Sequence, residues 1–360
     1  METKPASQQA RDLLVKGRRV ARRNVKQLVA RAQATRTLPT PVAAPKSAPV
    51  RPAEPVLPPS AALRRNGFTV YQGLFTPAEC AAYAAAFKAE AGIEPGKKYM
   101  KVDAPSAFAT AREILFEGRI LDAVRSALGE QPRFLQVGDL HYLHDTAGWH
   151  RDSVHRAHDS SEAPDWRPDA PPFGVVKAIL YMETQNAAMG IMSGSHATPI
   201  EMDHDRVKGI ETAGLQRIID HGQNPNLLLS DEQKKTPLVW HAQVGDVLVF
   251  DERMYHAGRR VDDDKVTTQR EAPKFTLSMV FGRDNAHSER MYSYFRYVRD
   301  ELAYKDLTPE FKAELARRDL VLEHGWGDFY RDHPDDLRHV HLPKPSKLDA
   351  LLAEYGAASV

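Results

Sequence analysis

Cysteine is almost absent from the sequence, which has only Cys80 among its 360 residues. One cysteine excludes an intramolecular disulfide and a cysteine-based zinc cluster, and it favours a reducing compartment. Long apolar runs are absent as well. No stretch approaches the roughly 20 residues of a membrane-spanning helix, and no signal-peptide pattern precedes the body of the chain. We therefore expect a cytoplasmic protein.

Net charge is close to zero, because 49 Lys and Arg face 48 Asp and Glu. This balance hides an asymmetry along the chain. Residues 1–60 contain 12 basic and 3 acidic residues, a net of +9, so the overall charge of +1 leaves −8 for the other 300 residues. Such an asymmetry predicts that the N-terminal segment and the rest of the chain have different roles.

Residues 1–37 are predicted to form a basic amphipathic arm. Leu14, Val25 and Leu28 lie along one side of a helical pattern, and Lys or Arg occupy most of the rest. Such a helix can bind an anionic membrane surface or an acidic partner, which would place the protein peripherally at a membrane. A solvated tail with partial helix is the simpler alternative. No specific nucleic-acid partner is expected.

Residues 38–60 follow as a Pro-rich linker, with 8 prolines between Pro39 and Pro59. Prolines at this density favour a polyproline-type spacer, which is semi-rigid and has no core of its own. The folded body is therefore expected to begin near residue 61.

Residues 61–285 combine short strands with a few flanking helices. A capping box from Thr76 to Glu79 begins a helix that Gly92 ends, and a second helix is expected over Arg119–Leu128. The strand patterns cover Phe68–Tyr71, Val175–Met182, Leu238–His241, Asp246–Phe250 and Phe275–Phe281. Short strands that do not alternate with helices favour a mainly β fold with flanking helices, either a sandwich or a jelly-roll barrel.

Two further segments are predicted to be helical. Residues 203–235 show a helical pattern near 207–219 and little strand signal, which indicates an insertion over the mouth of the barrel. Residues 286–360 are predicted to form a C-terminal helical extension packed on the barrel.

A His-x-Asp motif at His150 and Asp152 follows an apolar strand pattern. In a strand, residues two positions apart project to the same side, so an imidazole and a carboxylate would converge. A later strand pattern ends near His256, which would supply a second imidazole. Two histidines and one carboxylate on one face of an octahedral ion leave three positions open, as in non-haem Fe(II) oxygenases. The other His-x-Asp pair, His333 and Asp335, has no strand pattern after it.

Four segments resemble, in the same order, the landmarks of the phytanoyl-CoA dioxygenase family of Fe(II)/2-oxoglutarate oxygenases. They are GFTVYQGLFTPAEC, LQVGDLHYLHDTAGWHRDS, GIMSGSHATP and GDVLVFDERMYHAG. The resemblance implies a double-stranded β-helix, a cupin-like barrel, over residues 61–285, with Fe(II) held by His150, Asp152 and His256 as the catalytic centre. It also implies that O2 and 2-oxoglutarate are used to hydroxylate a small-molecule or carrier-linked metabolite, with succinate and CO2 as co-products.

The resemblance further implies a cation at the start of the last barrel strand, where the family binds the far carboxylate of 2-oxoglutarate. That register holds Lys274, whereas Arg270 lies 14 residues after His256 and matches the expected sequence distance better. We favour Lys274 because strand register is geometrically stricter than loop length, and Arg270 stays the alternative. Gln136, on the strand before the motif, is expected to contact the co-substrate.

Arg151, Trp166 and Arg253 are candidates for contact with the substrate at the barrel mouth, although surface arginines are more often simply solvated. Two other functions remain open. A metal-dependent hydrolase would use the same ligands on zinc, but the sequence offers it no evident general base beside the site. An inactive barrel would act as a binding module, but such a site would be free to lose one of its three ligands.

Overall fold

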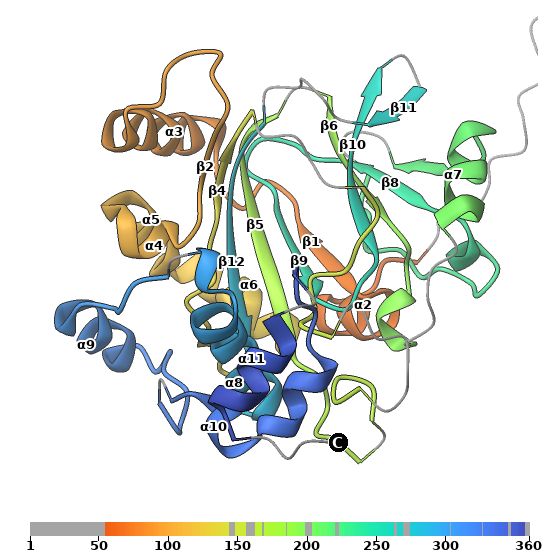
Figure 1. The fold of residues 1–360 in the computed structure, drawn as a ribbon. Helices are drawn as coiled ribbons and strands as arrows, with labels where there is room; N and C mark the ends of the chain where they lie inside the picture. The colour runs from red at the N-terminus through yellow and green to blue at the C-terminus, as the bar shows by residue number, and fades with distance from the viewer. Residues whose placement is uncertain are drawn as a thin grey trace, which may run out of the picture. The chain divides into compact units, whose positions relative to one another are not determined.

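A computed structural model of the chain is shown in Figure 1. The residues that it describes are 55–360 without 144–147, 156–162, 168, 185, 199–203, 220–222, 263–264, 269–273, 303, 326, 345–346 and 357–360. The basic arm predicted for residues 1–37 and most of the predicted linker lie outside them. Contacts of the folded body already begin at Val56, which pairs with Leu227, a few residues before the expected start. Within these described ranges, no helix combines the length and the apolar character needed to cross a bilayer.

Two sheets form the centre of the body, and their strands are antiparallel with one exception. The first sheet has the order β1-β9-β5-β12-β4-β2, with β3 also pairing with β12, and the second has the order β11-β10-β6-β8-β7. The strands of the first sheet are β1 Phe68–Tyr71, β2 Tyr99–Lys101, β3 Arg133–Phe134, β4 Leu140–Tyr142, β5 Val175–Thr184, β9 Val247–Asp251 and β12 Lys274–Gly282. Those of the second are β6 Ala187–Ile191, β7 Arg217–Ile219, β8 Leu238–His241, β10 His256–Asp262 and β11 Lys265–Thr268.

Strand β5 shows how the sheets are packed. Successive side chains of a strand point to opposite faces, and those of β5 enter two different cores. Ala178 and Leu180 join the cluster that the helices cover. Ile179 and Tyr181 join a second cluster, which also takes Trp240 from the other sheet. Both faces of the first sheet are therefore buried, and its inner face meets the second sheet.

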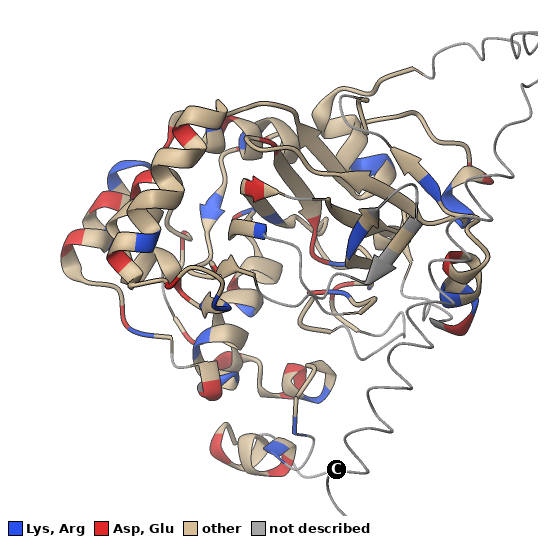
Figure 2. Ribbon diagram, turned by 90° about the horizontal axis from the view of Figure 1, so that it is seen from above, with Lys and Arg blue, Asp and Glu red and all other residues tan. Residues whose placement is uncertain are grey.

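Helices cover the outer face of the first sheet, as Figure 1 shows for α3 and α5 beside β2 and β4. Their buried side chains share one core with β5 and β12. The helices of this part are α2 Pro59–Asn66, α3 Pro77–Ala91, α4 Ala104–Ala107, α5 Ala109–Leu115, α6 Gly118–Leu128 and α9 Pro309–Arg317. Figure 2 shows acidic and basic residues mixed along the outer helices, and charged residues on several strands as well.

The helices near the C-terminus of the chain also pack on the first sheet. Tyr294, Tyr330 and Leu337 form one buried cluster with Leu135 and Val280, which belong to the sheet region. The elements are α8 Ala286–Ser293, a π-helical turn Tyr294–Val298, α10 Phe329–Asp332, a 3-10 turn Pro334–His339 and α11 Leu348–Glu354. By contact density, residues 54–360 form one compact unit.

The predicted strands at Phe68–Tyr71 and Leu238–His241 are confirmed with the same bounds, and the other three differ by one or two residues at their ends. The prediction for 203–235 was wrong in part. Helix α7, His204–Thr212, ends well before residue 219, and β7 adds to the edge of the second sheet by pairing in parallel with β8. Its Ile218 and Ile219 are too few to produce a period-2 pattern, which is why the strand escaped detection.

The capping box at the start of α3 is confirmed. The Glu79 amide donates to Thr76 Oγ1 at 3.2 Å, and the Thr76 amide donates to Glu79 Oε2 at 2.8 Å. We expect Thr76→Ala to lower the free energy of unfolding by about 1 kcal/mol, since one helical N–H loses its acceptor. Urea denaturation measures this loss. Thr76→Ser keeps the hydroxyl and should stay near the parent value; equal losses for both variants would show that the cap is not the cause.

Candidate metal centre

His150 and His256 are brought together by their backbones. The two residues form an isolated antiparallel bridge, in which each amide donates to the other carbonyl at 2.9 Å. Asp152 follows at the end of the same segment, where its amide and that of Ser153 both donate to the Glu252 carbonyl. Asp152 therefore does not lie in a strand, as the sequence had suggested, but the two hydrogen bonds to Glu252 fix its position.

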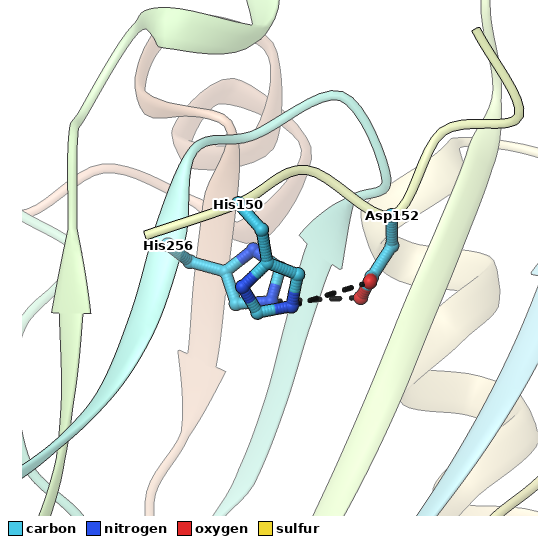
Figure 3. A group of neighbouring side chains, drawn as sticks. All are labelled: His150, Asp152 and His256. Carbon is cyan, nitrogen blue, oxygen red and sulfur yellow. Dashed lines mark ion pairs between the residues drawn. The ribbon is translucent and has the colours of Figure 1, made fainter. Parts of the chain in front are cut away.

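The three side chains converge, as Figure 3 shows. His150 Nε2 lies 3.4 Å from Asp152 Oδ1, and His256 Nε2 lies 3.5 Å from Asp152 Oδ2. One ligand atom from each residue lies within 4.8 Å of the others. Metal–ligand bonds of roughly 2.1 Å place ligand atoms at a right angle roughly 3 Å apart, so the spacing suits one ion with small adjustments.

Both imidazoles have a defined tautomer. Nδ1 of His150 lies 2.7 Å from the Gly148 carbonyl oxygen, and Nδ1 of His256 lies 3.0 Å from that of Met254. A carbonyl only accepts, so each Nδ1 carries the proton and each Nε2 presents a lone pair. This arrangement is the usual one for metal-binding histidines, whose other nitrogen donates to a backbone or carboxylate oxygen.

The charge states also suit a metal ion. Burial and the neighbouring His150 lower the pKa of His256 to about 3, so its ring is neutral at physiological pH. Burial opposes ionisation of Asp152, but the Lys177 ammonium holds its pKa well below the usual value. Lys177 Nζ, on β5, lies 2.5 Å from Asp152 Oδ2 and 3.6 Å from Glu252 Oε1.

The site opens into a cavity of about 240 Å³ between the two sheets. The three candidate ligands line this cavity. Its wall also includes Asp139, His141 and Lys177, together with three residues of β12, which are Lys274, Thr276 and Ser278. Period 2 on β12 places these three residues on one face of the strand. The sequence had pointed to Lys274 but not to Lys177 or Asp139. The signal for Lys177 was its place as the one lysine in the apolar run of β5, VVKAILYM.

Lys274 is a buried cation on the wall of this cavity, with 8% of its surface exposed. Among the described residues its ammonium has no hydrogen bond or ion pair, and burial lowers the pKa of this group to about 8. An ammonium in this position is costly unless an anion pairs with it. The wall at Lys274 therefore fits a carboxylate ligand. Arg270, the alternative anchor, lies outside the described residues.

The other predicted contacts do not line this cavity. Gln136 Nε2 donates to the Lys305 carbonyl at 2.6 Å and to Asp103 Oδ2 at 3.3 Å, so these two residues hold its amide outside the cavity. Arg151 and Arg253 place their guanidinium groups 5.2 and 5.0 Å from the Trp166 ring.

Arg151 also donates to the carbonyls of Ser195 and Thr198, and Arg253 donates to Asp251. These three predicted substrate contacts form a cluster that braces the segment around the ligands. Helix α7 lies near the ligands too, because its Val207 packs with Trp149 and Tyr255, the residues before His150 and His256.

Two solved structures are among those to which this chain is similar. SnoN, an epimerase solved in complex with Fe3+, alpha ketoglutarate and nogalamycin RO, is 14% identical over 63% of this chain and 82% of its own, with a TM-score of 0.42. HygX from Streptomyces hygroscopicus, solved with nickel and 2-oxoglutarate, is 18% identical over 63% of this chain and 88% of its own, also with a TM-score of 0.42. The search of curated proteins gave no match.

The family model for phytanoyl-CoA dioxygenase matches residues 63–265, which is more than half of the chain and includes His150, Asp152 and His256. The chain therefore belongs to the phytanoyl-CoA dioxygenase family of non-haem iron enzymes that depend on 2-oxoglutarate.

Proposed function

We propose that the protein is an Fe(II)- and 2-oxoglutarate-dependent dioxygenase that hydroxylates a small-molecule or carrier-linked metabolite and releases succinate and CO2. The observation that carries the proposal is the buried Lys274 ammonium, which faces the same cavity as His150, Asp152 and His256. A site for a bare metal ion would not need this cation. A dicarboxylate that reaches from the metal to the wall does need it.

The strand order supports a double-stranded β-helix for the catalytic body. Strands β4, β12, β5 and β9 are neighbours in one sheet, and β10, β6 and β8 are neighbours in the other. The His150 bridge to His256 extends the second sheet beyond β10. Four strand positions in each sheet would then face one another across the cavity, as the arrangement requires.

The roles of the chain's own residues follow from their positions. His150, Asp152 and His256 would hold the metal ion, and bound iron would supply the redox chemistry that activates O2. Lys274 would pair with the far carboxylate of 2-oxoglutarate, beside the hydroxyl groups of Thr276 and Ser278.

Lys177 would hold Asp152 in place through Asp152 Oδ2, and the apolar cavity residues Ile179, Met189 and Phe250 would limit the entry of water.

The alternatives explain less of the site. A zinc hydrolase would leave Lys274 without a role, and a binding module would not need two imidazoles with their Nε2 atoms directed at one carboxylate.

Mixing the protein with Fe(II) and 2-oxoglutarate without oxygen is expected to produce a weak visible charge-transfer band, which neither alternative predicts. Zn(II) in place of Fe(II) is the control and should give no band. A screen of metabolites for succinate release would then identify the substrate, and the absence of the band would refute the proposal.

A further inference from the structure

Asp139 is an acidic side chain on the wall of the cavity that contains the candidate ligands. It directly precedes β4, and its backbone pairs with Ser278 of β12 through two hydrogen bonds of 2.9 Å. Its Oδ1 atom is inaccessible to solvent and accepts no hydrogen bond from the described residues. A buried carboxylate oxygen without a donor costs free energy, and a ligand that brings a donor would recover it.

The nearby cation is already engaged. Lys177 Nζ contacts Asp152 Oδ2 at 2.5 Å and Glu252 Oε1 at 3.6 Å. Burial raises the pKa of Asp139 to about 6, in spite of the opposing effect of Lys177. Asp139 is therefore mostly ionised at neutral pH. The cation that stabilises its charge, Lys177, also contacts Asp152 and Glu252.

In a site loaded with Fe(II) and 2-oxoglutarate, the Asp139 carboxylate would have no lysine partner of its own. Fe(II) carries +2 and ionised 2-oxoglutarate carries −2, so the two cancel. The cavity wall then retains two cations, Lys177 and Lys274, and two carboxylates, Asp139 and Asp152. Glu252, which does not line the cavity, contacts Lys177 at 3.6 Å. Lys177 is thus shared by two other carboxylates and Lys274 would pair with 2-oxoglutarate, so the carboxylate on the wall without a contact from either lysine is that of Asp139.

The strand register separates this charge from the co-substrate. Asp139 lies opposite Ser278, four residues along β12 from Lys274. At about 3.3 Å per residue, the two positions are roughly 13 Å apart along the strand. The far carboxylate of 2-oxoglutarate would lie at the Lys274 end, so the Asp139 end is left for the substrate.

We propose that Asp139 recognises the substrate and that the substrate carries a protonated amine or another cationic nitrogen donor. This inference rests on the proposed function, because it assumes a site loaded with Fe(II) and 2-oxoglutarate. A cation here would donate to the Asp139 carboxylate and neutralise its charge. Hydrogen bonds to charged groups contribute more than neutral ones, so the group would select cationic over neutral molecules of the same shape.

The test uses two probes of equal shape, cyclohexylammonium and cyclohexanol, titrated into the full chain with Fe(II) and 2-oxoglutarate under anaerobic conditions. The perturbation of the charge-transfer band gives the dissociation constant of each probe. We expect cyclohexylammonium to bind at least tenfold more tightly. In Asp139→Asn, which keeps the shape of the side chain, this preference should fall to less than threefold while the band itself persists.

Asp103→Asn is the matched control, because Asp103 is a buried carboxylate near Asp139 that does not line the cavity. It should keep the tenfold preference. Equal binding of the two probes to the parent protein, or an unchanged preference in Asp139→Asn, would overturn the inference. Loss of the band in Asp139→Asn would also overturn it, since Asp139 would then support the metal site. A parent protein without any band would instead refute the proposed function.

Discussion

Replacing His150 or His256 with alanine is expected to abolish the charge-transfer band and turnover, and to weaken Fe(II) binding by more than about 100-fold. Each substitution removes a bond to the metal, whereas partners that only orient ligands typically contribute 10–100-fold. The fold should persist, because the backbone bridge between the two residues does not involve their side chains. Calorimetric titration with Fe(II) and circular dichroism measure the two effects separately.

Asp152 needs a different substitution. Asp152→Ala would leave Lys177 buried without its closest partner, which is destabilising, so a loss of activity could reflect unfolding. Asp152→Asn keeps the shape of the side chain and should still lose iron binding. Asp335→Ala is the control from the second His-x-Asp pair, since Asp335 has a side chain that is 77% exposed and pairs only with Arg338 among the described residues. Full activity in His256→Ala would show that the ligand assignment is wrong.

Replacing Lys274 with alanine is expected to raise the 2-oxoglutarate concentration for half-saturation at least tenfold. The hydrogen bond from an ammonium to a carboxylate contributes on the order of 1.5–3 kcal/mol, and tenfold in affinity corresponds to about 1.4 kcal/mol. Titration of the charge-transfer band with 2-oxoglutarate measures the affinity without turnover. Fe(II) binding in the absence of 2-oxoglutarate should stay unchanged, because Lys274 is not one of the candidate ligands.

Two further variants complete this test. Lys274→Arg keeps a cation at the wall and should recover most of the affinity, while Arg270→Ala should have a much smaller effect than Lys274→Ala. The reverse order would move the anchor to Arg270. An effect from neither residue would remove the main physical support for 2-oxoglutarate as the co-substrate.

The residues that form the centre were predictable because their signals are local or periodic. His150 and Asp152 follow a strand pattern, and His256 ends a second one. The register of the strand predicted at Phe275–Phe281 singled out Lys274, and Lys274, Thr276 and Ser278 all line the cavity. Side-chain period within a strand does not depend on the rest of the fold, so the strand face of Lys274 could be predicted from the sequence.

Other parts of the site depend on tertiary contacts. Gln136 has a positive φ of 56°, which breaks the strand alternation assumed for it and lets its amide reach Asp103 and the Lys305 carbonyl instead. Asp139 and Lys177 are 38 residues apart in the sequence, and only the pairing of β4, β12 and β5 brings them to one wall. The membrane or acidic partner of residues 1–37 stays a prediction.

The position of β1 has a consequence for the order of folding. Among the strands of the described residues, β1 lies at the edge of the first sheet and pairs with β9 alone, where Phe68 is opposite Phe250. On a ribosome that adds about 5–20 residues per second, β1 would wait roughly 10–40 s for this partner to be synthesised. Such distant pairing slows folding, because the loop must close before its contacts stabilise it. The first strand of the body is thus expected to be among the last to dock.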